Sequence, residues 1–194
     1  MKKIPSLFKR DYGSGARLVY DEVVPGTEWA HAGEGMATRK IDGTSCLIRG
    51  GKLYKRYDVK VGRTPPTGFE PAQEPDPISK HWPGWLPVGD GPEDRWHREG
   101  YANVVEAVGA LPDGTYELIG PKVLGNPEHV EAHTLVPHGA ESLPDVPRDF
   151  AALRAYLEAH EMEGIVFWRT QGDPDCDKVK VKRRDFGLLW PVNR

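Results

Sequence analysis

Proline is the strongest constraint on what this chain can fold into. Eight of its 18 prolines lie between Pro65 and Pro92, with three of its tryptophans scattered among or just beyond them. Because proline fixes φ and lacks the backbone N–H, a segment of this density is not expected to form a regular helix or a central strand. The sequence therefore predicts a long irregular loop over about 62–98, which is either functional or a lid held in place by its tryptophans.

The composition is that of a folded, water-soluble protein. The 194 residues are 38 % hydrophobic and 28 % charged, which favours one core and a single domain over 1–194. No run approaches ~18 apolar residues, so no membrane span is expected, and the N-terminus lacks the features of a signal peptide. Cys46 and Cys176 are the only cysteines. Two cysteines give no disulfide framework and favour a reducing, cytoplasmic setting.

Strand-like segments dominate the rest of the chain. β-branched and aromatic residues gather in several runs, and helical spacing is clearest in 147–160. Strands are predicted at 17–24, 35–40, 45–49, 52–60, 115–119, 164–169 and 177–182, helices at 101–109 and 147–160, and turns at 50–51 and 172–174. Hairpin-linked strands with segregated helices indicate an α+β fold with mostly antiparallel sheets.

Two short stretches have more than one interpretation. The sequence KIDG at 40–43 is compatible with an ordinary strand that runs into a hairpin, and equally with a nucleophilic Lys40. In DKVKVK at 177–182, alternation places the valines on one face and the lysines on the other. That pattern fits an exposed edge strand protected by lysines, or a row of ammonium groups that bind phosphate.

Two acids have the same ambiguity. Glu163 precedes the predicted strand 164–169, and a hairpin to 177–182 would bring its carboxylate beside the lysines, where it could hold Mg²⁺. Glu117 lies inside the predicted strand 115–119, where an isolated carboxylate is costly to bury without a partner.

Five motifs together carry a family resemblance. KIDG, KRYD at 55–58, YELIG, EGIV and KVK occur in the order and rough spacing of the nucleotidyltransferase motifs of ATP-dependent polynucleotide ligases and capping enzymes. The strings GTYELIGPKVLGNP and KVKRRDFGL resemble the small RNA ligase branch more closely than DNA ligases. The resemblance covers about 17–190 and implies a nucleotidyltransferase core of the ATP-grasp-like ligase type.

The resemblance also implies a chemistry. An RNA ligase of this kind joins 5′-phosphate and 3′-hydroxyl ends of RNA through a covalent lysyl-AMP, with ATP as adenylyl donor and Mg²⁺ or Mn²⁺ as the metal. Lys40 would attack the α-phosphorus, and neighbouring cations would lower its pKa. The resemblance gives the other roles as follows: phosphate binding by Lys180 and Lys182, ribose contacts by Arg56 and Glu117, metal binding by Glu163, and organisation of the site around Lys40 by Asp42 and Gly43.

Other functions stay open at this point. Related ligases commonly carry a further domain, often an OB fold, after the last motif, whereas 12 residues follow Lys182. No appended OB domain is therefore expected, and an accessory nucleic-acid-binding or end-processing protein is a candidate partner. The alternatives are a DNA ligase, a capping-type enzyme, and a nucleotide-binding regulator without ligation activity. The net charge of −3 requires a polyanion to bind at a local patch, such as the basic run at 178–184.

Three histidines receive no role from the sequence. His129, His133 and His138 lie in PEHVEAHTLVPHG, whose spacing matches no closed zinc site and has no nearby cysteine.

Overall fold

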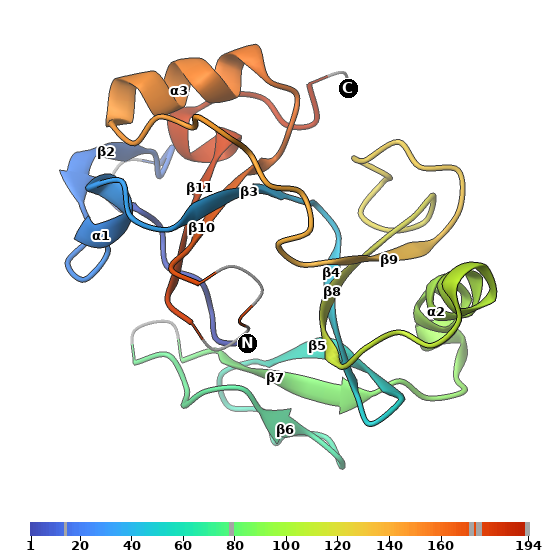
Figure 1. Cartoon of the computed structure of the whole chain (residues 1–194). Coiled ribbons are helices and arrows are strands. Elements are labelled where there is room, and N and C mark those ends of the chain that lie inside the picture. Colours follow the sequence, from blue (N-terminus) through green and yellow to red (C-terminus); the bar gives the residue numbers. More distant parts are fainter. Residues whose placement is uncertain (14, 78–79, 171–172, 174–175, 193–194) are drawn as a thin grey trace. The chain divides into compact units, whose positions relative to one another are not determined.

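The computed structural model describes residues 1–13, 15–77, 80–170, 173 and 176–192 (Figure 1). The chain divides into two compact units. Unit 1 contains residues 1–3 and 42–138, and unit 2 contains residues 4–41 and 139–194. The chain passes from unit 2 to unit 1 within the KIDG stretch, between Ile41 and Asp42.

Unit 2 is built on a three-stranded antiparallel sheet. Its strands are β3 (Met36–Lys40), β10 (Gly164–Trp168) and β11 (Lys178–Lys182), in the order β11-β10-β3. The other elements of the unit are β1 (Phe8–Arg10), β2 (Val19–Val23), α1 (Glu28–His31), α3 (Phe150–Ala159) and the 3-10 helix η2 (Arg183–Phe186).

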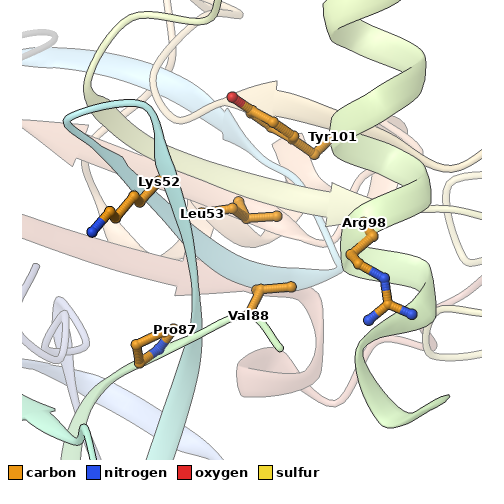
Figure 2. Close-up of a pocket in the computed structure, with 6 residues that line it drawn as sticks. All are labelled: Lys52, Leu53, Pro87, Val88, Arg98 and Tyr101. Atoms are coloured by element: carbon orange, nitrogen blue, oxygen red, sulfur yellow. The ribbon is translucent and has the colours of Figure 1, made fainter. Parts of the chain in front are cut away.

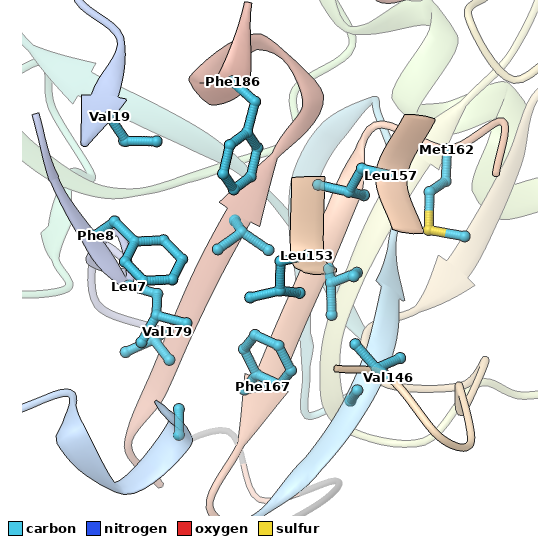
Figure 3. Packing of buried hydrophobic residues seen from close by; sticks show 14 of the residues in the cluster. Leu7, Phe8, Val19, Val146, Leu153, Leu157, Met162, Phe167, Val179 and Phe186 are labelled. Carbon is cyan, nitrogen blue, oxygen red and sulfur yellow. The ribbon is translucent and has the colours of Figure 1, made fainter. Parts of the chain in front are cut away.

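One face of this sheet is the core of unit 2. Val179 and Val181 lie on that face with Ile165 and Phe167 of β10, and α3 covers them with Leu153 and Leu157 (Figure 3). The lysines of β11 alternate with these valines and therefore lie on the opposite face. The predicted alternation in 177–182 is confirmed.

The strand β11 is not an exposed edge. The Leu7 N–H donates to the Lys180 carbonyl at 2.9 Å, and the Lys180 N–H donates to the Pro5 carbonyl at 2.9 Å. These bonds extend the pairing by a parallel bridge between Ser6 and Lys180. The interpretation of β11 as a bare edge strand protected by lysines is therefore wrong, because the N-terminal segment already occupies that edge.

Unit 1 is built on a six-stranded antiparallel sheet in the order β6-β7-β5-β4-β8-β9. Its strands are β4 (Thr44–Arg49), β5 (Lys52–Val59), β6 (Glu70–Pro71), β7 (Trp82–Pro87), β8 (Gly114–Ile119) and β9 (Thr134–Pro137). The 3-10 helix η1 (Pro92–Asp94) leads into α2 (Arg95–Val108), which packs on a core that includes Cys46, Tyr116 and Leu118.

The prediction of one irregular loop over 62–98 is wrong for the middle of that segment. β7 pairs with β5 over six residues despite containing Pro83 and Pro87. Its other neighbour, β6, is only two residues long and pairs with Gly84 and Trp85. Both prolines therefore lie outside the short ladder on that side, where a missing N–H costs no inter-strand bond to β6.

Helix boundaries differ from the predicted ones for local reasons. α3 begins at Phe150 and not at Pro147, because the Asp149 side chain caps it by accepting from the Ala152 N–H at 2.9 Å. The helix predicted at 101–109 is the second half of α2. The turn expected at 172–174 lies largely outside the described residues. The expectation of an α+β fold with mostly antiparallel sheets is confirmed, and the structure has few helices among the described residues.

Candidate functional site

The strand register of unit 2 brings three predicted site residues into one region. Gly164 of β10 pairs with Lys40 on one side and with Lys182 on the other, so both lysines flank this glycine on the same face. Lys180 lies two residues before Lys182 on β11 and therefore points to that face as well. Together with Glu163, these three lysines are called the lysine cluster below.

Glu163 and Gly164 form the centre of the cluster. The Lys40 ammonium donates to the Glu163 carboxylate in an ion pair. The Lys40 side chain is 22 % exposed and that of Glu163 is 10 % exposed, so the ion pair is only partly buried on the lysine side. A Cβ at Gly164 would collide with the backbone carbonyl of Val181. A glycine is therefore required for β10 and β11 to pair this closely beside the ion pair.

The electrostatics of the cluster act most strongly on Lys180. Burial, the largest cause, and the charges of Lys40 and Lys182 together lower the pKa of Lys180 to about 8, while Glu163 and Asp185 oppose the shift. These interactions show that the three amines share one electrostatic environment. A bound anion would relieve their repulsion.

Asp185 fixes the end of β11 and is itself neutralised. One of its oxygens accepts from the Lys182 N–H at 3.0 Å, and the other accepts from Arg10. Four cations, Arg10 and the three lysines, thus meet two carboxylates, Glu163 and Asp185. The region carries an excess of positive charge on a protein whose net charge is −3.

Lys178 belongs to the same strand but has a different environment. Its ammonium lies 4.6 Å from the centre of the Trp168 ring and donates to the Cys176 carbonyl at 3.1 Å. The alternating sequence alone does not distinguish this buried lysine from Lys180 and Lys182.

Unit 1 holds the second group of predicted site residues, around Glu117 of β8. Oε1 of Glu117 accepts from the Gly43 N–H at 3.1 Å, and Oε2 lies 2.7 Å from Nε2 of His138. Because a carboxylate only accepts, the His138 proton must be on Nε2. A Cβ at Gly43 would collide with the Leu118 carbonyl, which explains the glycine at this position.

Arg56 shares a face of the unit 1 sheet with Glu117. Ser45 pairs with Glu117 directly. Arg56 follows Lys55, which pairs with the core residue Cys46, so Arg56 points to the face opposite the core, as Ser45 and Glu117 do. We define the Glu117 face as Ser45, Arg56 and Glu117 together with Gly43 and His138, which donate to the Glu117 carboxylate. Burial lowers the pKa of Arg56 and Asp58 opposes the shift, while its guanidinium lies 5.2 Å from the Trp85 ring and donates to the Met1 carbonyl.

Two members of this face have polar atoms without a hydrogen-bond partner in the described part of the chain. These atoms are the buried Oγ of Ser45 and the buried Nδ1 of His138. Buried polar atoms are normally paired, so both are candidates to meet a ligand. Neither residue was predicted as a site residue, because each meets Glu117 only through strand pairing between distant segments, and no local motif marks it.

The other predicted residues have the following environments. The backbone N–H of Asp42 donates to Glu128 at 2.8 Å. His133 is buried, lies 2.8 Å from Glu99 and stacks on Trp96 at 4.6 Å, which makes it a structural residue. Among the described residues, no group of three or more His, Cys, Asp and Glu side chains could hold a metal ion. Within the same residues, no helix is long and apolar enough to cross a membrane.

A protein-family model matches part of the chain. Residues 102–194 match the family model of RNA ligase 1. The resemblance to RNA ligases is confirmed. The RNA ligase match begins inside α2 and includes Glu117, Glu163, Lys180 and Lys182, whereas Lys40 and Arg56 precede it. No curated protein sequence matches the chain.

Proposed function

We propose that the chain is an ATP-dependent RNA ligase that joins 5′-phosphate and 3′-hydroxyl ends through a covalent lysyl-AMP on a nucleotidyltransferase core. The observation that carries this proposal is the lysine cluster. It holds the partly exposed Lys40 beside a carboxylate and two further cations. Together with the RNA ligase match, this arrangement favours adenylyl transfer over simple nucleotide binding.

The first step is attack of the Lys40 Nζ on the α-phosphorus of ATP. A nitrogen–phosphorus bond forms, the bond to the bridging oxygen breaks, and pyrophosphate leaves. The ammonium must lose one proton before it attacks, and the carboxylate of Glu163, its ion-pair partner, is the acceptor at hand. The second proton passes to solvent as the phosphoramidate forms. Lys180 and Lys182 neutralise the negative charge that develops on the phosphate oxygens.

Two further transfers complete the reaction. A 5′-phosphate oxygen of RNA displaces Lys40 from the adenylyl phosphorus, which gives a pyrophosphate-linked RNA end. A 3′-hydroxyl then attacks the 5′-phosphorus of that end, and AMP leaves as the phosphodiester forms. Transfer of AMP to the 5′-phosphate gives that phosphorus a good leaving group, AMP, which the free 5′-phosphate lacks. The resemblance assigns Arg56 and Glu117 to the ribose and Asp42 and Gly43 to the organisation of the site.

The lysine cluster can offer a divalent metal one carboxylate, that of Glu163. Glu163 would hold Mg²⁺ or Mn²⁺ through one carboxylate, since Mg²⁺ commonly takes one or two carboxylates and completes its shell with phosphate oxygens and water. When bound, the metal would supply further neutralisation of phosphate charge. Asp185 is already engaged by Arg10 and by the Lys182 N–H, so it is not expected to be a ligand.

The experiment that tests the proposal is covalent labelling with α-labelled ATP. We expect an acid-labile protein–AMP adduct with the parent protein and no adduct with Lys40→Arg. Arginine keeps the charge at this position but stays protonated and cannot attack. Persistence of the adduct in Lys40→Arg would exclude Lys40 as the nucleophile.

Joining assays then separate the alternative functions. We expect sealing of a 5′-phosphorylated RNA and little sealing of the same sequence with a deoxyribose at the 3′-hydroxyl end, since the 2′-hydroxyl distinguishes RNA from DNA. Labelling by GTP in place of ATP would indicate a capping-type enzyme, equal sealing of DNA a DNA ligase, and an adduct without sealing a regulator.

A further inference from the structure

Unit 1 contains a pocket that is not part of the Glu117 face. It has a volume of about 400 Å³ and is lined by residues of β5, the end of β7 and α2 (Figure 2). The lining residues are Lys52, Leu53, Pro87, Val88, Arg98 and Tyr101. This volume lies within the range of about 300–1,000 Å³ that small-ligand sites occupy.

The pocket combines an aromatic wall with an apolar floor. Tyr101 extends from α2 toward the hairpin that joins β4 and β5, and its hydroxyl lies 3.5 Å from the Gly51 carbonyl (Figure 2). Leu53 and Val88 lie between the hairpin and the helix, and the Val88 N–H donates to the Leu53 carbonyl at 3.0 Å. A flat, largely apolar group suits such a lining.

Cations lie on two sides of this floor. Lys52 is on the hairpin and Arg98 is on α2, one helical turn before Tyr101. None of the six lining residues is acidic. Within the described part of the chain, neither Lys52 nor Arg98 forms an ion pair. Arg98 also donates to the Gly89 and Gly91 carbonyls, which fixes the loop before η1.

We propose that this pocket binds one unpaired nucleotide of the RNA strand, with the base against Tyr101 and flanking phosphates near Lys52 and Arg98. The choice of RNA rests on the proposed function. Aromatic rings bind successive bases by stacking, and lysine or arginine beside the ring neutralises the backbone. A single-stranded segment is required, because a base inside a duplex is stacked between its neighbours and cannot present its face to a side chain.

The test measures binding of a short 5′-phosphorylated single-stranded RNA by fluorescence anisotropy. Tyr101→Leu keeps apolar volume but removes the ring, and we expect the Kd to rise by about tenfold, as for loss of one stacking partner. Tyr101→Phe keeps the ring and should bind within about twofold of the parent protein. Thermal unfolding of both variants shows whether Tyr101, which also packs against the unit 1 core, has been replaced without loss of fold.

The salt dependence of RNA binding gives an independent test of the proposed pocket. Lys52→Gln should weaken binding and reduce the salt slope of log K by about 0.7, the value for one phosphate on a single strand. The matched control is Lys60→Gln, which replaces an exposed lysine just beyond the end of β5 and outside the pocket. Lys60→Gln should leave the slope as it is in the parent protein.

Labelling by ATP separates this inference from the proposed function. Pocket variants should form the covalent adduct at the parent rate, because that step needs no RNA. Absence of the adduct in the parent protein would overturn the ligase proposal and leave the pocket to be judged by RNA binding alone. Unchanged RNA binding in Tyr101→Leu, or an equal loss in Tyr101→Phe, would overturn the nucleotide pocket.

Discussion

The lysine cluster of unit 2 and the Glu117 face of unit 1 differ in how their charged groups are compensated. In the lysine cluster, like charges are held together, and the pKa of Lys180 is lowered to about 8 by burial and by its cationic neighbours. On the Glu117 face, a single carboxylate receives a backbone N–H and an imidazole, and its two oxygens are satisfied.

This difference indicates two kinds of ligand group. A region that retains repelling cations gains most from a highly charged anion, such as a polyphosphate. A carboxylate held in place by two donors can still accept from hydroxyl groups, because each oxygen has a second lone pair. The contrast thus fits phosphate chemistry in unit 2 and recognition of a sugar in unit 1.

The largest predicted effect comes from removing a repelling cation. Lys180→Met should lower the rate of adenylation by about 100-fold or more, the usual cost of losing one preorganised charge in a transition state. The single-turnover rate of adduct formation with saturating ATP measures this effect.

Lys178→Met is the matched control for that substitution. It removes an amine from the same strand, but one that lies against Trp168 and away from the cluster. Equal losses in the two variants would mean that β11 acts through its overall charge and not through the position of Lys180.

The second prediction concerns stability and pH. The lowered pKa means that the native state holds a proton on Lys180 less readily than the unfolded chain does. The penalty is therefore fully present below about pH 8 and disappears as pH rises toward the ordinary value of 10.5. Lys180→Met should accordingly be more stable than the parent by about 1–3 kcal/mol near pH 7, with little difference near pH 10.

Urea unfolding at the two pH values measures this gain. Lys178→Met should show no gain, because it loses a ring contact and a hydrogen bond to the Cys176 carbonyl. A Lys180→Met protein that is less stable than the parent near pH 7 would show that the cluster is not strained by charge. A gain in stability with a loss of activity is the pattern expected of a functional site.

The sequence predicts the two regions to different extents. Alternation with a period of two was enough to separate Val179 and Val181 from the lysines, because strand geometry leaves no other choice. The register that puts Gly164 between Lys40 and Lys182 depends on pairing between segments more than 100 residues apart. No local pattern contains that information.

The same limit explains what was missed in unit 1. β7 forms because β5 offers it a full ladder and β6 a short one, although its own prolines disfavour a strand. His138 lies 21 residues after Glu117 and meets it only through the pairing of β8 with β9. Local propensity was overruled in both cases by contacts made in the fold.

The third prediction tests the carboxylate of the Glu117 face. Glu117→Gln keeps the shape of the side chain but replaces one accepting oxygen by an amino group that cannot accept from a ribose hydroxyl. We expect the ATP concentration for half-maximal adenylation to rise by about tenfold, roughly 1.4 kcal/mol, with a smaller change in the maximal rate. Titration of the labelling rate with ATP separates the two effects.

A control for Glu117→Gln is available on α2. Glu106→Gln makes the same chemical change at an exposed position and should leave both quantities unaltered. A Glu117→Gln protein whose maximal rate falls as sharply as that of Lys180→Met would erase the distinction between a region for chemistry and a region for orientation.

The smallest predicted effect concerns Ser45, whose buried hydroxyl has no hydrogen-bond partner among the described residues. Leaving such a group unpaired costs about 1–3 kcal/mol, so Ser45→Ala should unfold at the same or a higher urea concentration than the parent protein. If a nucleotide supplies the missing partner, the same substitution should raise the half-saturating ATP concentration by about twofold to tenfold, since one neutral hydrogen bond contributes about 0.5–1.5 kcal/mol.

Tighter folding combined with weaker ATP binding is the combination expected of a ligand contact. An Ser45→Ala protein that binds ATP as the parent does would show that the hydroxyl belongs to the packing of the sheet, and the Glu117 face would then consist of Arg56 and Glu117 with its two donors.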